Sequence, residues 1–378
     1  GEYLSVRKLS LIRKKRETTA LRYYSTGRDS MGYQKENGKG KGQEGIAVCD
    51  MGQRVRHGIE LVHFQITKNC NLRCWFCGQW GKKGFFSDAC GTQMNFADWE
   101  KIVSQLVAYR KETGNSPDIM LWGGEPLLCP FFEELVHLLR ENEFALGIVT
   151  NGTRIDRYAP LLKQEFRHIY VSVDGDRESH DRVRGQGVFD KVSENLGLIY
   201  GGNAKISIMT VISQDNIEKL QELPDVLCAL PCDEVILQDL IVLTEQEAEE
   251  YKRWMKNCFG SDAAEIDSWV GESVDEEKKR AALEQIRAEK YPKRVIWLPH
   301  GKAASYCRSP FSHIHIAWNG NVLYCTDFYD FSAGNVKDEP LLEIFENGLS
   351  EKFREEIRLG HCVTCQHCSW RNNEDFYL

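Results

Sequence analysis

The sequence predicts an α/β fold in which a curved parallel sheet carries helices on its outer side. Between residues 61 and 242, short apolar runs with strand character alternate six times with longer stretches of helical spacing. Strand–helix units that follow one another in this way pack as parallel strands joined by crossover helices. The conspicuous motifs of the chain follow directly after predicted strands, at the edge where parallel α/β folds bind ligands.

The predicted strands are residues 61–67, 119–122, 145–150, 169–173, 204–212 and 234–242, and the later helices are 130–142, 156–165, 189–200 and 216–227. The first helix begins near Asn95 and runs past Tyr109. Asn95 suits the N-cap because its side-chain oxygen can accept a hydrogen bond from the first turn, and Asp98 at position N3 favours the positive end of the helix dipole.

Four segments follow one another along the chain. Residues 1–57 are a basic, glycine-rich extension, which reads either as a docking arm for an acidic peptide or as a solvated tail. Residues 58–243 hold the six strand–helix units, and residues 244–298 form an acidic helical bridge that ends in a strand. Residues 299–378 are a small α+β domain, because His313 to Cys325 reads as a hairpin with an Asn319-Gly320 turn.

Composition indicates a cytoplasmic enzyme with no nucleic-acid or membrane partner. The net charge is −8 over 378 residues, which argues against binding to polyanionic surfaces. No apolar run reaches the roughly 18 residues of a membrane span, and residues 9–12 are too short for a signal sequence. The 14 cysteines could suggest disulfides, but that interpretation belongs to short secreted chains, so we expect a reducing compartment.

Three cysteines follow the first strand with the spacing C-x3-C-x2-C: Cys70, Cys74 and Cys77. Three thiolates can ligate three irons of a cubane iron–sulfur cluster, because each cysteine binds one iron. The fourth iron then keeps an open coordination position, as catalytic zinc does. The alternative is a zinc knuckle, which these residues fit poorly because zinc prefers four ligands in two separated pairs.

Further motifs follow the next strands. Leu121-Trp-Gly-Gly-Glu-Pro126 contains paired glycines, which let the backbone approach a ligand closely, and Glu125 could accept a hydrogen bond from an ammonium group. On its own this motif would be an ordinary turn before proline. Val149-Thr-Asn-Gly152 ends the third strand, and Tyr170-Val-Ser-Val-Asp-Gly175 ends the fourth.

This combination of motifs resembles the radical S-adenosylmethionine (SAM) superfamily. The resemblance implies a partial (β/α)6 TIM-like barrel, which matches the count of six units. It also implies that SAM binds the open iron of a [4Fe–4S] cluster and is cleaved reductively to a 5′-deoxyadenosyl radical, which takes hydrogen from the substrate. The cofactors then carry the difficult chemistry, and a flavodoxin- or ferredoxin-like protein donates the electron.

The resemblance also assigns roles to individual residues. Phe76 matches an aromatic position near the adenine, with an ordinary core aromatic as the alternative. The SAM-binding residues that the motifs imply are Gly123, Gly124, Glu125, Pro126, Asn151, Ser172 and Asp174. Arg184 could face the SAM carboxylate, because a planar guanidinium suits a carboxylate, or could be a solvated loop residue.

A second cysteine set, formed by Cys307, Cys325, Cys362, Cys365 and Cys368, resembles the SPASM/twitch extension of this superfamily. The resemblance implies one auxiliary [4Fe–4S] cluster held by Cys307, Cys325, Cys365 and Cys368, with Cys362 spare or replacing one of them. There are too few cysteines for two complete clusters. Four protein ligands suit electron transfer or a structural role, and a zinc ribbon is the alternative.

Two other thiols and one amide are weaker candidates. Cys90 and Cys129 lie where a thiol could donate hydrogen to a substrate radical, although a buried inert thiol is the alternative for each. Gln238 on the sixth strand would face the substrate cavity by family analogy.

We therefore expect an enzyme that modifies a ribosomally made peptide through a crosslink, a thioether or an epimerisation. Oxidation or epimerisation of a small polar molecule, such as a sugar or aminocyclitol, is the alternative. A non-enzymatic zinc-binding module is a third hypothesis, which leaves the glycine-rich and Ser-Val-Asp-Gly motifs unexplained.

Overall fold

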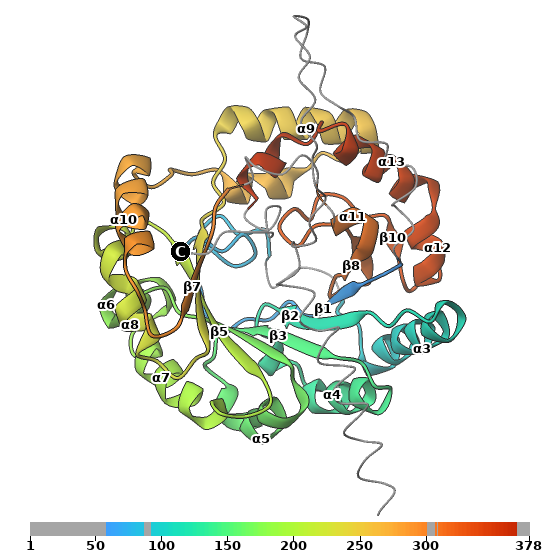
Figure 1. Cartoon of the computed structure of the whole chain (residues 1–378). Coiled ribbons are helices and arrows are strands. Elements are labelled where there is room, and N and C mark those ends of the chain that lie inside the picture. Colours follow the sequence, from blue (N-terminus) through green and yellow to red (C-terminus); the bar gives the residue numbers. More distant parts are fainter. Residues whose placement is uncertain (1–57, 87–91, 301–306, 308, 369–378) are drawn as a thin grey trace, which may run out of the picture. The chain divides into compact units, whose positions relative to one another are not determined.

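Ten strands in the described ranges form a single sheet, in which eight are paired in parallel and the last two join by antiparallel pairing. The computed structural model describes residues 58–86, 92–300, 307 and 309–368, so the predictions for residues 1–57 and for Cys90 lie outside the described residues. The strand order is β10-β9-β8-β1-β2-β3-β4-β5-β6-β7, and β10 and β7 remain its two edges. The sheet is therefore a partial barrel that does not close, as Figure 1 shows.

The strands are β1 (Leu61–Thr67), β2 (Asp118–Gly123), β3 (Leu146–Thr150), β4 (His168–Ser172), β5 (Lys205–Ile212), β6 (Glu234–Asp239), β7 (Arg294–Leu298), β8 (His313–Ile316), β9 (Asn321–Leu323) and β10 (Gly334–Asn335). The helices are α3 (Phe96–Thr113), α4 (Phe132–Glu141), α5 (Ile155–Glu165), α6 (Arg177–Arg184), α7 (Val188–Ile199), α8 (Leu223–Cys228), α9 (Glu245–Phe259), α10 (Glu276–Ala288), α11 (Ser309–Ser312), α12 (Leu341–Glu346) and α13 (Gly348–Arg358). Short 3-10 helices are η2 (Pro126–Leu128), η3 (Ile217–Glu222), η4 (Ala264–Trp269) and η5 (Val363–His367).

The six predicted strand–helix units are confirmed, with shifted ends. The sixth strand stops at Asp239 rather than at residue 242, and the helix predicted over 216–227 divides into η3 and α8. Pro224 explains the division, because proline is tolerated in the first turn of a helix but not in its interior. Helix α6 was not predicted, because its sequence RESHDRVR is almost entirely polar.

Alternate residues of each strand face the outer helices. On β1 these are Val62, Phe64 and Ile66, which are fully or almost fully buried. Phe64 packs against Trp99 of α3 with ring centroids 4.8 Å apart. Burial of one such side chain stabilises the fold by roughly 1.5–3 kcal/mol. In Figure 1, α3, α4, α5 and α7 surround the outer side of the sheet, where this core lies.

The first helix begins as the sequence predicts. The Asn95 side chain accepts from the Asp98 backbone amide at 3.1 Å, and the Asp98 carboxylate accepts from the Asn95 amide at 3.0 Å. This reciprocal capping box satisfies two backbone donors at the helix start. Gly114 ends α3 in the left-handed conformation, with φ of 74°.

The predicted C-terminal hairpin forms, and it also joins the barrel. Strands β8 and β9 are antiparallel around the Asn319-Gly320 turn, and β8 pairs in parallel with β1 from Leu61↔His313 to Phe64↔Ile316. The small C-terminal domain therefore extends the barrel sheet instead of forming a separate layer. This pairing brings the second cysteine set to the strand that leads into the first.

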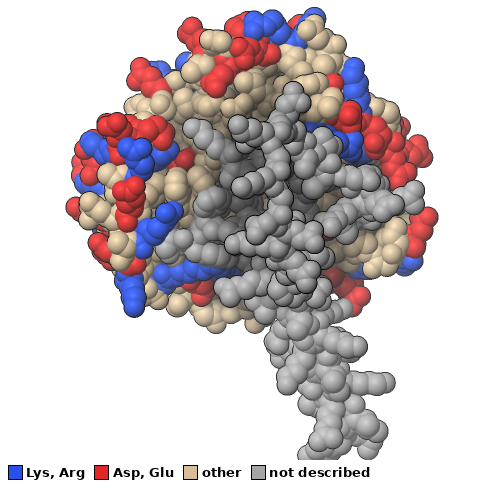
Figure 2. Space-filling model, turned by 45° about the horizontal axis from the view of Figure 1, so that its top comes forward, with Lys and Arg blue, Asp and Glu red and all other residues tan. Residues whose placement is uncertain are grey.

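None of the helices in the described ranges is long and apolar enough to cross a membrane. On the face shown in Figure 2, basic and acidic side chains are interspersed.

Candidate active site

The loop after β1 holds the first cysteine set. Cys74 is buried, Cys70 and Cys77 are half-buried, and none of the three is in a disulfide. Backbone amides point at two of the sulfurs: Leu72 N lies 3.4 Å from Cys70 Sγ, and Trp80 N lies 3.5 Å from Cys77 Sγ. Such donors stabilise sulfur that carries negative charge.

The electrostatics of this loop suit a cationic centre. Burial and the charges of Glu125, Cys74 and Cys77 raise the pKa of Cys70 to about 11, and burial also raises the pKa of Cys74. Thiolates crowded this way need a positive partner, and the irons of a cluster would supply it. The donor set of free thiols therefore fits an iron–sulfur cluster. Within the described part of the chain, no three His, Cys, Asp or Glu side chains form a ligand set for a single metal ion.

The glycine pair approaches the start of this loop closely. Gly124 N donates to Thr67 O at 2.9 Å, and Glu125 N donates to Asn69 O at 2.7 Å. A Cβ on Gly124 would lie 2.4 Å from the carbonyl oxygens of Asn69 and Lys68. Only glycine fits here, because the neighbouring atoms are backbone and cannot move aside. The Gly123-Gly124 pair therefore lets the glycine motif lie directly against the start of the cysteine loop.

Glu125 connects the glycine motif to the end of β3. Its carboxylate accepts hydrogen bonds from Leu127 N at 3.1 Å, from Thr150 Oγ1 at 2.7 Å and from Asn151 N at 2.7 Å. Glu125 is fully buried, and burial raises its pKa to about 7 although the three donors oppose this shift. The carboxylate thus stabilises the loops from inside, and Pro126 continues the chain as the first residue of η2.

Asn151 extends this connection to the cysteine loop. Its side-chain amide donates to Asn71 Oδ1 at 3.1 Å and lies 4.0 Å from Cys70 Sγ. Phe76 is half-buried and packs with Leu72, Cys74 and Val183 in a small apolar cluster beside the cysteines. Both predicted residues therefore lie at the cysteine loop.

Arg184 pairs with Asp174 beneath the same loop. Arg184 Nε donates to Asp174 Oδ2 at 2.7 Å, and the side chains are 9% and 0% exposed. Burial alone would lower the pKa of Arg184, but Asp174 and the Cys74 thiol outweigh it and raise the pKa. The alternative of a solvated arginine is therefore wrong. Ser172 is half-buried at the end of β4.

The second cysteine set lies in the C-terminal part of the chain, mostly after β9 and around η5. Cys325 follows β9, whereas Cys362, Cys365 and Cys368 bound or lie within η5. Cys365 lies within electrostatic range of Cys307 and Cys325, and Cys325 within range of Cys368. None of the five cysteines is in a disulfide.

Cys362 contacts its neighbours and is not isolated from the set. The Cys365 thiol donates to the Cys362 sulfur, which lowers the pKa of Cys362 and raises that of Cys365. Thr364 Oγ1 lies 3.2 Å from Cys362 Sγ. The contact between Cys362 and Cys365 keeps Cys362 among the candidate ligands.

Several residues of this region were missed by the sequence reasoning. Tyr329 contacts the rings of Phe85, Trp122 and His315, with centroids 5.1, 6.4 and 5.5 Å away. Burial, then Asp327, and more weakly Cys77 and Cys325, raise the pKa of Tyr329, so its phenol stays protonated. Tyr329 therefore lies within electrostatic range of both cysteine sets.

Inward-facing residues of β1 were missed too. The alternation His63, Gln65, Thr67 between apolar Val62, Phe64 and Ile66 was the available signal. Asp327, two residues after Cys325, is also near this region, and burial raises its pKa to about 6.

The two weaker predictions that fall on described residues have different outcomes. Cys129 is 2% exposed, packs in the main core and donates to Ile66 O at 3.8 Å. Burial raises its pKa to about 12. This placement argues against Cys129 as a hydrogen donor to a substrate, and it corrects that prediction. Gln238 is half-buried on β6, on the same side of the strand as Ile236, and its role stays a prediction.

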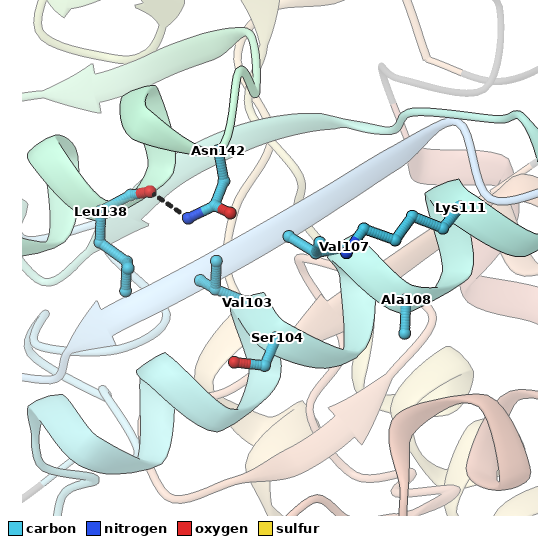
Figure 3. A pocket seen from close by; sticks show the side chains of 7 residues that line it. All are labelled: Val103, Ser104, Val107, Ala108, Lys111, Leu138 and Asn142. Atoms are coloured by element: carbon cyan, nitrogen blue, oxygen red, sulfur yellow. Dashed lines mark hydrogen bonds between the residues drawn. The ribbon is translucent and has the colours of Figure 1, made fainter.

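One pocket in the described part of the chain lies away from the predicted site residues. A groove of about 310 Å³ opens between α3 and α4 and is lined by Val103, Ser104, Val107, Ala108, Lys111, Leu138 and Asn142 (Figure 3). None of the predicted site residues lines it. Its residues belong to the outer helices, whereas the cysteines and their motifs lie at the strand ends, so we locate the candidate site at the strand ends.

Comparisons with known proteins match two parts of the chain to family models. The model of the Radical SAM superfamily matches residues 64–227, and that of the SPASM iron–sulfur cluster-binding domain matches residues 307–369. A Fe-coproporphyrin III synthase of Methanosarcina barkeri is 23% identical over 355 residues, which cover 82% of this chain and 80% of the relative. A cysteine-type anaerobic sulfatase-maturating enzyme of Clostridium novyi is 24% identical, covering 80% and 83%.

A solved structure shares the fold. The crystal structure of Streptococcus suis SuiB bound to its precursor peptide SuiA aligns with a TM-score of 0.58 at 15% identity, covering 95% of this chain and 83% of SuiB. The likeness supports the partial barrel with its C-terminal extension.

The matches confirm the predicted enzyme class and the predicted cofactors, which are SAM, a [4Fe–4S] cluster and auxiliary iron–sulfur binding. The hypothesis of a non-enzymatic zinc module is therefore wrong. The chain belongs to the radical SAM superfamily and carries a SPASM iron–sulfur cluster-binding domain.

Proposed function

We propose that this radical SAM enzyme modifies a ribosomally made peptide by forming a crosslink, a thioether or an epimerised residue. Two comparisons support a peptide or protein substrate: one relative is named for maturing a sulfatase, and SuiB was solved with its precursor peptide. When bound, SAM and the cluster supply a 5′-deoxyadenosyl radical that removes hydrogen from the substrate. We infer a cytoplasmic location, since the cysteines of both sets form no disulfide and cluster thiolates need a reducing compartment. A flavodoxin- or ferredoxin-like protein is the proposed electron donor.

We propose that Cys70, Cys74 and Cys77 hold the SAM cluster. The neighbouring backbone of Gly123 and Gly124, fixed by Glu125 and Asn151, would then border the bound SAM. These contacts support the assignment because they join three separate strand ends into one rigid edge.

Arg184 is the proposed partner of the SAM carboxylate. Its Nε is used by Asp174, and no other hydrogen bond of its guanidinium is found among the described contacts. The two terminal nitrogens are therefore available for a carboxylate, which a planar guanidinium binds well. Phe76 and Ser172 would border the rest of the cofactor.

We propose that Cys307, Cys325, Cys365 and Cys368 hold the auxiliary cluster, with Cys362 as the alternative ligand. His361 and His367 are poorer candidates, because His361 Nδ1 contacts Glu356 at 2.8 Å and His367 Nε2 contacts Glu247 at 2.7 Å. Both histidines thus already have carboxylate partners.

The observation that carries the proposal is that Tyr329 contacts Gln79, two residues after Cys77, and the ring of His315, which in turn contacts the Cys325 carbonyl. A substrate bound against Tyr329 would meet the SAM side and the auxiliary side at once.

Iron and acid-labile sulfide per chain test the cluster assignments after anaerobic purification. We expect about eight irons in the wild type and about four in a Cys307→Ala, Cys325→Ala double variant. Cys258→Ala on α9 is the matched control, since Cys258 belongs to neither set, and it should keep the wild-type iron. An iron content of about four in all three proteins would remove the auxiliary cluster from the proposal.

Deuterium transfer tests the substrate class. Peptides encoded beside this gene, deuterated at their α and β carbons, should transfer deuterium into 5′-deoxyadenosine. Absence of transfer from every such peptide would contradict the proposal.

A small-molecule substrate is the second candidate. It is favoured by the match to Fe-coproporphyrin III synthase, whose name gives a tetrapyrrole product. It predicts that deuterium comes from a labelled small molecule, such as a tetrapyrrole, a sugar or an aminocyclitol, and from no peptide.

A further inference from the structure

Three buried polar atoms on adjacent strands have no hydrogen-bond partner among the described residues. They are Gln65 Oε1 on β1, Trp122 Nε1 on β2 and His315 Nε2 on β8. Gln65 is 0% exposed and His315 is 2% exposed. Buried polar groups are nearly always hydrogen-bonded, so three such atoms on neighbouring strands need an explanation.

The three side chains share the inner side of the barrel. Gln65 and Trp122 are register partners of β1 and β2, and Trp122 lies 4.8 Å from the His315 ring, centroid to centroid. Their neighbours along the strands, Phe64 and Leu121, belong to the core on the outer side. Because side chains alternate along a strand, the three polar residues face the interior.

A fourth and a fifth residue tie this group to both cysteine sets. Gln65 Nε2 donates to Gln79 Oε1 at 3.4 Å, and Gln79 Nε2 donates to Tyr329 Oη at 3.3 Å. Gln79 is two residues after Cys77 in the chain. The group is therefore connected through Gln79 to the loop of the first cysteine set and through Tyr329 to the segment after Cys325.

The partners already present decide which of the three atoms donate. His315 Nδ1 lies 3.1 Å from the carbonyl oxygen of Cys325, which can only accept, so Nδ1 carries the ring proton. In the neutral ring, Nε2 is then an acceptor. Gln65 Oε1 is a second acceptor, and Trp122 Nε1 is a donor.

We propose that these atoms form a subsite for a primary carboxamide of the substrate, the side chain of an asparagine or glutamine. The NH2 group would donate to Gln65 and His315, and its carbonyl would accept from Trp122. A carboxylate has no proton for the two acceptors, and an ammonium or guanidinium leaves Trp122 without an acceptor. The assignment rests on the proposed peptide substrate, whose side chain it specifies.

An unpartnered buried atom is not sufficient by itself. Trp99 Nε1 also has no partner among the described residues, but Trp99 lies in the outer core against Phe64. The subsite differs because two acceptors and one donor lie on three neighbouring strands, on one side of the sheet. Trp99 therefore supplies a matched control, in which an indole N–H is lost away from the subsite.

Equilibrium binding tests the subsite without turnover. Asparagine, glutamine, aspartate and leucine, each with an N-acetyl and an N-methylamide cap, are titrated calorimetrically into the cluster-loaded, SAM-bound enzyme. We expect the asparagine or glutamine compound to bind at least about tenfold more tightly than the aspartate and leucine compounds, because a site built for hydrogen bonds rejects analogues that lack them.

Two variants locate this preference. Gln65→Leu and Trp122→Phe should each abolish the preference, whereas Trp99→Phe should keep it. Iron content and circular dichroism confirm that each variant is folded and loaded. Equal binding of all four compounds, no binding of either carboxamide, or a preference retained in both subsite variants would overturn the proposal.

A crystal soaked in acetamide gives an independent outcome. Acetamide density at Gln65, Trp122 and His315 supports the subsite, whereas a retained water molecule overturns it, because water offers the same two donors and one acceptor. The results of these binding experiments can be distinguished from a failure of the proposed peptide function. Deuterium transfer from a peptide without carboxamide preference leaves the peptide function intact, and carboxamide preference without transfer from any peptide leaves the subsite intact.

Discussion

The Glu125 carboxylate accepts a 2.7 Å hydrogen bond from the backbone amide of Asn151, which joins the end of β2 to the end of β3. The same carboxylate accepts from Thr150 and Leu127, so one buried side chain satisfies three donors from two loops. Asn151 in turn contacts Asn71 in the cysteine loop. The geometry of the proposed SAM site therefore depends on a residue with no exposed surface.

Glu125→Gln should weaken this connection. The glutamine NH2 would face one of three donors, and a buried donor left without an acceptor costs about 1–3 kcal/mol. We expect a lower unfolding midpoint in urea and weaker SAM binding in equilibrium dialysis. Glu133→Gln on the exposed side of α4 is the control and should change stability by less than about 0.5 kcal/mol. Unchanged SAM binding in the Glu125 variant would contradict the role given to this carboxylate.

Gly124→Ala should disturb the cysteine loop more than the rest of the fold. The new Cβ would lie 2.4 Å from two backbone oxygens, so the loop start must move. We expect iron per chain to fall while the far-ultraviolet circular dichroism is retained. Gly197→Ala on α7 is the control, because a Cβ there meets nothing within 4 Å and alanine favours a helix by roughly 0.5–1 kcal/mol. Normal iron content in Gly124→Ala would mean that the loop tolerates the shift.

The sequence predicted the elements better than their assembly. Periodicity and capping residues such as Asn95 specify a helix or strand locally, so the six strand–helix units and the Asn319-Gly320 hairpin were predictable. The pairing of β8 with β1 was not, because it joins Leu61 to His313, and nothing local encodes contacts so far apart in sequence. Both edge strands of a sheet offer unpaired backbone groups, so tertiary packing decides which edge an added strand such as β8 pairs with.

The candidate site divides in the same way. Cys70, Glu125 and Asp174 were predicted because they belong to contiguous motifs. Gln65 and Tyr329 were missed because their importance depends on neighbours from other strands. Cys129 was misjudged, because its closeness in sequence to Glu125 did not reveal that its thiol faces the core.

Lys279→Met should destabilise the junction between α10 and β6. Lys279 Nζ lies 3.0 Å from Asp239 Oδ2, with side chains 6% and 4% exposed. Removing one partner of a buried ion pair typically costs about 3–5 kcal/mol, because the remaining charge is left without compensation. The partners Trp297 and His300 still donate to Asp239, so we expect the lower part of that range.

Lys278, the neighbour of Lys279 in the chain, provides the control for denaturation by urea. Lys278 pairs with Glu218 at 2.5 Å, but the two side chains are 44% and 71% exposed. Exposed pairs contribute only about 0–1 kcal/mol, so Lys278→Met should be close to neutral. Equal urea midpoints for the two variants would show that the buried pair contributes no more than the exposed one.

The pair Glu265 and Asp330 should make stability depend on pH. Glu265 N donates to Asp330 Oδ1 at 3.0 Å, and one carboxylate oxygen of each residue is buried without a partner among the described atoms. Burial, and then the charge of Asp330, raises the pKa of Glu265 from 4.5 to about 7. Burial likewise raises the pKa of Asp330 from 3.8 to about 6.

A raised pKa means that the folded protein binds more protons than the unfolded chain between the two values. The stabilisation is therefore complete below the unfolded pKa values and is lost as the pH rises through about 6 for Asp330 and about 7 for Glu265. A Glu265→Gln, Asp330→Asn double variant cannot ionise at these positions, and the asparagine keeps the Oδ1 acceptor. Melting temperatures of the cluster-loaded proteins, measured across this pH window, should fall less steeply in the variant than in the wild type. Asp338→Asn at an exposed position should retain the wild-type slope, and an equal slope in the double variant would mean that other groups cause the pH dependence.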